Sequence, residues 1–175
     1  MNQFFRVLLI ALQGLALFMP VLVASSRMGA VYQLNNNNPY NGVIVWRIED
    51  DGSLEFVKQV PTGGAGSGPV GALFGIDPLV SQGSITVVDE NLFAVNANSN
   101  SITYFEINRH DATSLNFIDS APTFGQFPVS VGGHRRTICA VTGGVGNGIR
   151  CWRFSRRGLT LLPWDRLLSK FLVIS

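Results

Sequence analysis

The sequence predicts an all-β protein, because short strand-like runs alternate with turn signals and no stretch of useful length shows helical spacing. Charged residues make up only 14% of the 175 residues, against roughly 25% in an average protein. The chain also holds 19 glycines, which disfavour helix. The length favours a single domain. A formal net charge of +2 gives no electrostatic case for a nucleic-acid partner.

The strand-like runs follow one another closely after residue 29. Runs at 30–35 and 43–48 flank a turn cluster that ends in Asn-Gly, a strong hairpin signal, and a third run covers 54–60. The central stretch 81–107 continues with runs at 84–88, 92–95 and 102–107. The run LFAV at 92–95 is almost continuously apolar, which predicts a strand that is covered on both faces.

The same side-chain pattern occurs three times, at a spacing of about 40 to 50 residues that a Gly-rich insertion at 62–83 widens once. Equivalent positions are Tyr32, Phe93 and Cys139; Trp46, Phe105 and Trp152; and Phe56, Phe117 and Leu161. Repeats of this length with four strands each are typical of β-propeller blades. Residues 84–88 and 128–132 fit the innermost strands of the second and third copies. We therefore expect a partial β-propeller of about three four-stranded antiparallel blades in residues 26–160, with the first blade incomplete.

The two ends depart from this pattern. Residues 1–25 carry one positive charge before an apolar run and then small residues, as in a secretory signal peptide, so we expect a secreted protein with no membrane contact after cleavage. The alternative is a retained membrane anchor. At the other end, residues 161–175 form an aberrant tail, in which Leu167, Leu168, Phe171 and Leu172 have the spacing of a short amphipathic helix.

Three blades do not close a propeller, which typically takes four to eight. One interpretation is that this chain is a fragment of a longer reading frame. The alternative is a small protein that completes itself by self-association through its open blade edges.

Several stretches resemble, in order, the secreted fungal 3-carboxymuconate cyclase-like proteins, relatives of the lactonase-type propellers. They are AVYQLNNNNPYNGVIVWRIEDDGSLEF, PTGGAGSG, DPLVSQGS, LFAVNANSNSITYFEI, FGQFPVSV and the pair Cys139 and Cys151. The resemblance covers residues 29–160 and implies a propeller fold that acts on a small cyclic acid or lactone. Some fungal members are secreted antigens or surface proteins. The chain is shorter than those relatives.

Asp77, Gln82 and Gln126 are the candidate ligand-binding residues, because they flank the entry to the expected innermost strands, near a channel mouth. A carboxylate there can bind a cation or act as a base. The alternative, ordinary loop polarity, is the more common explanation. His110 and His134 fall in expected turns with no nucleophile nearby in sequence.

No cofactor or metal site is predicted. Residues 66–71 fit the spacing G-x-G-x-x-G, but no helix follows as a dinucleotide site requires, so we interpret them as a loop. Two cysteines without a third nearby ligand do not make a metal site.

Cys139 and Cys151 lie on expected strands joined by the turn TGGVGNG. In an exported protein this placement predicts a disulfide, and the alternative is two buried thiols. Six arginines make the third copy basic: Arg135, Arg136, Arg150, Arg153, Arg156 and Arg157. We interpret them as a scattered basic edge rather than as an anion site.

Two functional hypotheses remain. The first is a lactonase-like or cyclase-like enzyme, which requires acid–base groups to converge at the channel mouth. The second is a non-catalytic secreted or cell-surface binding protein. Because few such groups are present near the expected mouth, we predict that the chain as given does not hydrolyse lactones.

Overall fold

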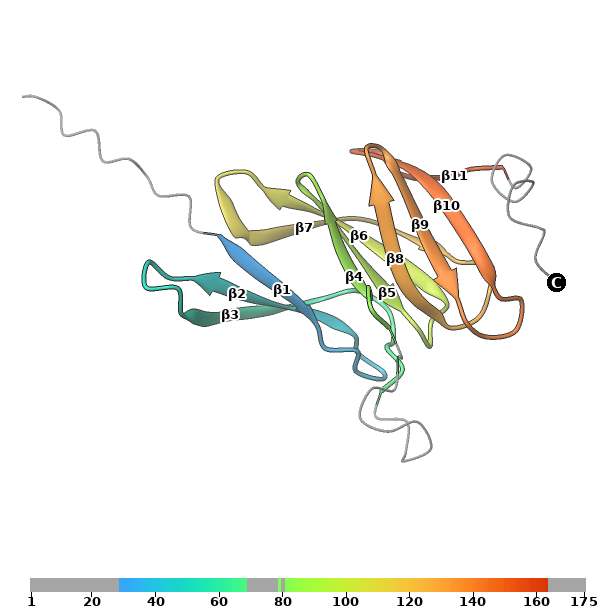
Figure 1. The fold of residues 1–175 in the computed structure, drawn as a ribbon, viewed down its shortest axis with the longest axis horizontal. Coiled ribbons are helices and arrows are strands. Elements are labelled where there is room, and N and C mark those ends of the chain that lie inside the picture. Colours follow the sequence, from blue (N-terminus) through green and yellow to red (C-terminus); the bar gives the residue numbers. More distant parts are fainter. Residues whose placement is uncertain (1–28, 69–78, 80, 164–175) are drawn as a thin grey trace, which may run out of the picture.

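The computed structural model describes residues 29–68, 79 and 81–163, and it contains eleven strands in three antiparallel sheets (Figure 1). No helix occurs in these ranges. The all-β prediction is confirmed. The expected signal peptide at 1–25, the C-terminal helix and Asp77 all lie outside the described residues.

The three sheets correspond to the three predicted blades. Blade 1 has the strand order β1-β2-β3, blade 2 the order β4-β5-β6-β7, and blade 3 the order β11-β10-β9-β8. The strands are β1 (Ala30–Leu34), β2 (Gly42–Ile48), β3 (Leu54–Pro61), β4 (Ile85–Val88), β5 (Asn91–Asn96), β6 (Ser101–Asn108), β7 (Asp111–Pro122), β8 (Pro128–His134), β9 (Thr137–Thr142), β10 (Gly148–Ser155) and β11 (Gly158–Leu161). As predicted, the first blade lacks a described innermost strand.

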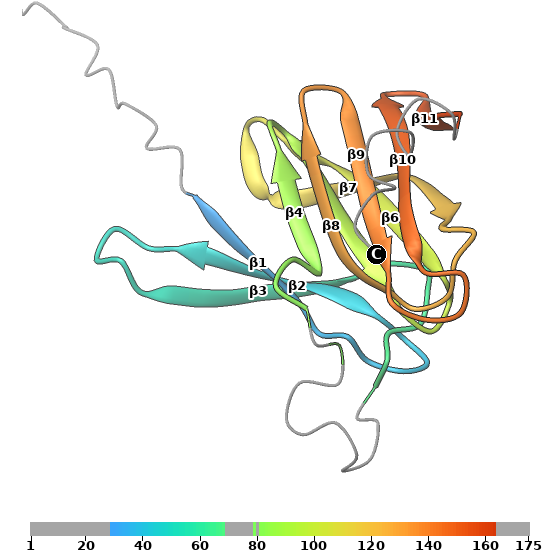
Figure 2. The ribbon, with the colours of Figure 1, turned by 45° about the vertical axis from the view of Figure 1, so that its right-hand side comes forward.

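Strand pairing confirms the repeat. Val31 pairs with Trp46 in blade 1, as Leu92 pairs with Phe105 in blade 2 and Ile138 with Trp152 in blade 3. The innermost strands β4 and β8 lie side by side (Figure 2). One local expectation was wrong: His134 is the last residue of β8 rather than a turn residue, because it pairs with Thr137 across the two-residue turn Arg135–Arg136.

Blades 2 and 3 meet through an aromatic core. The rings of Phe93 and Tyr104 are stacked with centroids 4.8 Å apart, and Phe154 of blade 3 lies 4.9 Å from Phe93. Trp152 and Ile138 complete the blade 3 side of this buried cluster. Such stacked and tilted ring pairs add to the free energy gained from apolar burial, so they hold the two sheets together.

Blades 1 and 2 meet through a second, aliphatic core. Val43 and Val45 of β2 pack with Leu92, Ala94 and Phe105 of blade 2, and all five side chains are fully buried. Successive strand residues point to opposite faces. Residues Leu92 to Val95 of β5 therefore serve both cores, and the predicted double coverage of this strand is confirmed.

A buried network of amides and hydroxyls joins blades 1 and 2 at one end of the sheets. The Asn96 side chain is its centre: its Oδ1 accepts hydrogen bonds from Asn41 Nδ2 at 2.9 Å and Thr62 Oγ1 at 2.6 Å. Its Nδ2 donates to Thr103 Oγ1 at 2.9 Å and to Ser101 Oγ at 3.1 Å. A buried amide is costly when its partners are missing, so this network ties the two blades in one register.

The loop that follows β3 fits closely around this network. A Cβ added to Gly64 would lie 2.5 Å from Asn96 Cγ, and one added to Gly66 would collide with the Asn36 backbone. Ser67 N donates to Asn36 Oδ1 at 2.9 Å. The described part of the Gly-rich motif, residues 66–68, is therefore a loop that packs on the β1–β2 turn.

Replacing Asn96 should weaken the blade 1–blade 2 contact selectively. We expect Asn96→Ala to lower the free energy of unfolding by about 3 kcal/mol, because buried partners lose their hydrogen bonds, as measured by urea denaturation. Asn98→Ala is the matched control, since Asn98 is exposed in the same turn and should change the stability by less than about 0.5 kcal/mol. Equal effects of the two substitutions would contradict the role of the network.

A disulfide links the two central strands of blade 3. Cys139 on β9 and Cys151 on β10 are directly paired in the register, with a Cα–Cα distance of 4.0 Å and an S–S distance of 2.01 Å. The structure thus contains the disulfide that the sequence predicts, and both cysteines are used in it.

Removing this disulfide should destabilise the protein without changing its fold. We expect Cys139→Ala/Cys151→Ala to lower the free energy of unfolding by about 3 kcal/mol, because the cross-link closes a short loop in the unfolded chain. Thermal unfolding with and without reductant measures the effect, and the reduced native protein should match the double variant. A double variant as stable as the oxidised protein would contradict this expectation.

Candidate functional site

The two ends of the blades differ sharply in charge. The loops at one end, residues 36–41, 97–100, 123–127 and 143–147, contain no charged residue. The turns at the opposite end follow β4, β6, β8 and β10, and they carry carboxylates and arginines at 89–90, 109, 135–136 and 156–157. Charged side chains are therefore concentrated at the second end, which we call the charged end.

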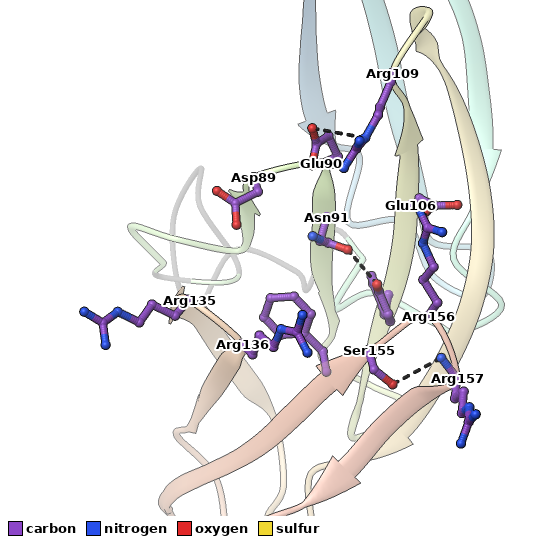
Figure 3. A pocket seen from close by; sticks show the side chains of 12 residues that line it. Asp89, Glu90, Asn91, Glu106, Arg109, Arg135, Arg136, Ser155, Arg156 and Arg157 are labelled. Atoms are coloured by element: carbon purple, nitrogen blue, oxygen red, sulfur yellow. Dashed lines mark hydrogen bonds and ion pairs between the residues drawn. The ribbon is translucent and has the colours of Figure 1, made fainter.

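A cleft of about 1180 Å³ lies at the charged end, between blades 2 and 3 (Figure 3). Each of these blades contributes two turns to it, so the packing of the two sheets creates the site. Its lining comprises Asp89, Glu90, Asn91, Tyr104, Glu106, Arg109, Arg135, Arg136, Phe154, Ser155, Arg156 and Arg157.

Two ion pairs organise the walls of the cleft. Arg109 Nε lies 3.3 Å from Glu90 Oε1 and joins the two turns of blade 2. Arg156 Nε lies 3.3 Å from Glu106 Oε1 and crosses from blade 3 to blade 2. Both arginines are largely exposed, and exposed pairs contribute little stability. Their effect is to hold the guanidinium groups at the edge of the cleft.

The floor of the cleft is aromatic. The Tyr104 hydroxyl donates a hydrogen bond to Asn91 Oδ1 at 2.6 Å, and Phe154 packs against the Tyr104 ring. Burial raises the pKa of Tyr104, the charge of Glu106 raises it further, and Arg156 opposes the shift. Tyr104 therefore remains a neutral donor at ordinary pH and is not a base.

The cleft has an excess of positive charge, with five arginines against three carboxylates. Among the described residues, no carboxylate forms an ion pair with Arg135, Arg136 or Arg157. Arg136 is held against β10, since its carbonyl oxygen accepts a hydrogen bond from Phe154 N at 3.0 Å. Arg135 points away from the other labelled side chains (Figure 3). Guanidinium groups bind carboxylates and phosphates with paired hydrogen bonds, so this arrangement suits a small anion.

Two of the three residues predicted for ligand binding, Gln82 and Gln126, lie at the other end, and Asp77 lies outside the described residues. Gln82 and Gln126 are exposed and precede β4 and β8, whereas the cleft lies beyond the last residues of those strands. The neighbouring Ser81 Oγ and Ser130 Oγ lie 3.1 Å apart. The structure thus places the loop of Gln82 against β8, and neither glutamine lines the cleft. A ligand-binding role for Gln82, Gln126 and Asp77 stays a prediction.

The cleft was not predicted from the sequence, although its arginines are visible there. We interpreted six arginines as a scattered edge, but the structure brings four of them to one cleft: Arg135, Arg136, Arg156 and Arg157. Their position in turns at the same end of two hairpins was the available signal.

Within the described ranges, no group of three or more His, Cys, Asp or Glu side chains is arranged to hold a metal ion. Those ranges likewise contain no helix able to span a membrane.

Comparison with solved structures shows the fold. A functionally unknown protein from Desulfotomaculum acetoxidans matches with a TM-score of 0.53 and 17% identity, over 77% of this chain and 41% of its own. A putative 6-phosphogluconolactonase from Bacteroides uniformis matches with a TM-score of 0.50 and 17% identity, over 79% of this chain and 36% of its own. The three sheets are arranged like blades of a lactonase-type β-propeller fold. The chain thus spans less than half the length of these proteins.

The likeness does not extend to a sequence family. No protein-family model matches the chain, and no curated protein matches it. At 17% identity the similarity concerns the propeller architecture alone, and function has to be argued from the site.

Proposed function

We propose that this protein is a secreted, lactonase-like propeller protein that binds a small anionic cyclic acid or lactone in the cleft between blades 2 and 3. The observation that carries the proposal is the surplus of arginine in a cleft on a lactonase-type fold. The disulfide is compatible with an extracellular location, since disulfides persist in oxidising compartments.

A ring compound with a carboxylate or phosphate group fits the cleft chemically. Its anionic group would pair with Arg136 or Arg157, while the buried Phe154 and Tyr104 supply an apolar floor for the ring. Sugar-phosphate lactones and carboxymuconate-type acids both have this combination of a compact ring or chain and negative charge. These two classes are the substrates that the fold and the sequence resemblance suggest.

The cleft supports binding better than hydrolysis. Ser155 and Tyr104 supply the only hydroxyl groups among its lining residues, and Ser155 Oγ accepts a hydrogen bond from Arg157 N at 3.2 Å. Among the described contacts, neither hydroxyl is hydrogen-bonded to a lining carboxylate: Tyr104 donates to Asn91 Oδ1, and Glu90 and Glu106 pair with arginines. Neither His110 nor His134 lines the cleft, so the described lining shows no nucleophile hydrogen-bonded to a base. This observation favours the second candidate, a non-catalytic secreted or surface binding protein.

The binding proposal is tested by calorimetric titration with 6-phosphogluconate and 3-carboxymuconate. We expect Arg136→Gln and Arg157→Gln each to weaken binding about tenfold, because a charge-assisted hydrogen bond is lost. Lys58→Gln is the control, since Lys58 is a cation on β3 of blade 1 and does not line the cleft. Affinity should fall with added salt. Binding that survives both cleft substitutions unchanged would refute the assignment.

Hydrolysis is tested separately by following acid release from gluconolactone and its 6-phosphate. We expect the purified chain to give the buffer rate, because the described cleft lacks a nucleophile–base pair. Turnover above that rate that Ser155→Ala abolishes would instead make the cleft catalytic.

A further inference from the structure

We propose that two copies of this chain associate head to tail, each placing the outer face of blade 3 on the outer face of the other copy's blade 1. The forward face of a blade is the one turned toward the next blade in the chain, and the backward face is turned toward the preceding blade. The structure shows forward-on-backward contact twice, at blades 1–2 and 2–3. It leaves one backward face, on blade 1, and one forward face, on blade 3, without a described partner.

The backward face of blade 1 carries the residue types that the other backward faces bury. Val31 occupies the position of Leu92 and Ile138, as the register with Trp46, Phe105 and Trp152 shows. Leu92 and Ile138 are 0% exposed, whereas Val31 is 38% exposed. Ile48, on the same face, is also exposed. An apolar face of this kind marks an interaction surface.

The forward face of blade 3 likewise exposes residues whose counterparts in blade 2 are buried. Ile149 and Val141 are paired on β10 and β9, in the positions that Ile102 and Val95 occupy in blade 2. Ile102 and Val95 are fully buried against the next blade, whereas Ile149 is 44% and Val141 40% exposed. The two uncovered faces are thus the two halves of one further junction of the kind already present.

Charge at the junctions supports the pairing of these two faces. The residue after each repeat aromatic (Trp46, Phe105 or Trp152) is charged. Glu106 pairs with Arg156 of the next blade at 3.3 Å. Arg47 pairs with Glu55 of its own blade, and its positive charge also acts on Asp111 of the next blade. Hydrogen bonds from Thr113 hold the pKa of Asp111 below its usual range, and the positive charges of Lys58 and Arg47 lower it further.

Arg153 takes this position in blade 3, and the corresponding turn of blade 1 carries Asp50 and Asp51. The new junction would therefore bring an arginine to two carboxylates, which repeats the opposite-charge rule of the existing junctions.

Two such junctions close the assembly. Copy one places blade 3 on blade 1 of copy two, and copy two returns the same contact, so that every blade face has a partner. Head-to-tail contacts form a ring when their rotation closes, and the six blades of two copies lie within the usual range of four to eight.

The test is the mass of the purified chain in solution, by sedimentation velocity over a concentration series. We expect a dimer. Val31→Lys and Ile149→Lys should each raise the dimer dissociation constant about 100-fold or more, because each buries an unpaired charge. An equimolar mixture of the two variants should recover association, since one junction in the mixed dimer joins two unaltered faces. Ile48→Lys provides a second variant of the blade 1 face in case Val31→Lys does not fold.

Phe56→Lys is the matched control. Phe56 is 56% exposed on blade 1, but its repeat counterpart Phe117 stays 57% exposed although blade 1 covers that face of blade 2. The substitution should therefore leave association unchanged. A monomer at all concentrations would overturn the proposal, as would an Ile149→Lys variant that dimerises like the native chain. So would isolation of the natural protein as a longer, monomeric chain whose additional blades cover these faces.

Discussion

A propeller blade has two apolar faces, and a single sheet cannot bury either of them by itself. Strand β5 shows the constraint most clearly: Leu92 and Ala94 face blade 1, Phe93 and Val95 face blade 3, and all four are fully buried. Apolar burial is the dominant favourable term in folding. The stability of each blade is therefore a property of its junctions, as in other repeat proteins whose neighbours share their cores.

The two junctions between blades differ in the polar interactions at their ends. At the uncharged end of blades 1 and 2, Asn96 is saturated by side chains from both sheets. At the charged end of blades 2 and 3, Glu106 and Arg156 meet across the junction. A satisfied buried network specifies one arrangement because any other leaves amides unpaired. An exposed ion pair does so only weakly.

Much of the fold could be predicted because its signals are local or periodic. The Asn-Gly turn, the continuous apolar run of β5 and the recurrence of Trp46, Phe105 and Trp152 are all visible in the sequence. The cleft was not predictable in this way, since Arg109 and Arg157 are far apart in the chain and line one cleft only when two sheets pack. The role of Asn96 was hidden for the same reason: its partners Asn41 and Thr62 come from another blade.

The charged residues that follow Trp46, Phe105 and Trp152 also help to explain the order of the blades. Arg47, Glu106 and Arg153 alternate in sign. If blade 3 followed blade 1 directly, Arg47 would face Arg156, and if blade 1 followed blade 2, Glu106 would face Asp50. Like charges brought together disfavour an incorrect partner more than opposite charges strengthen a correct one. Since the apolar faces of the three blades are similar, these charges distinguish junctions that apolar burial alone would allow.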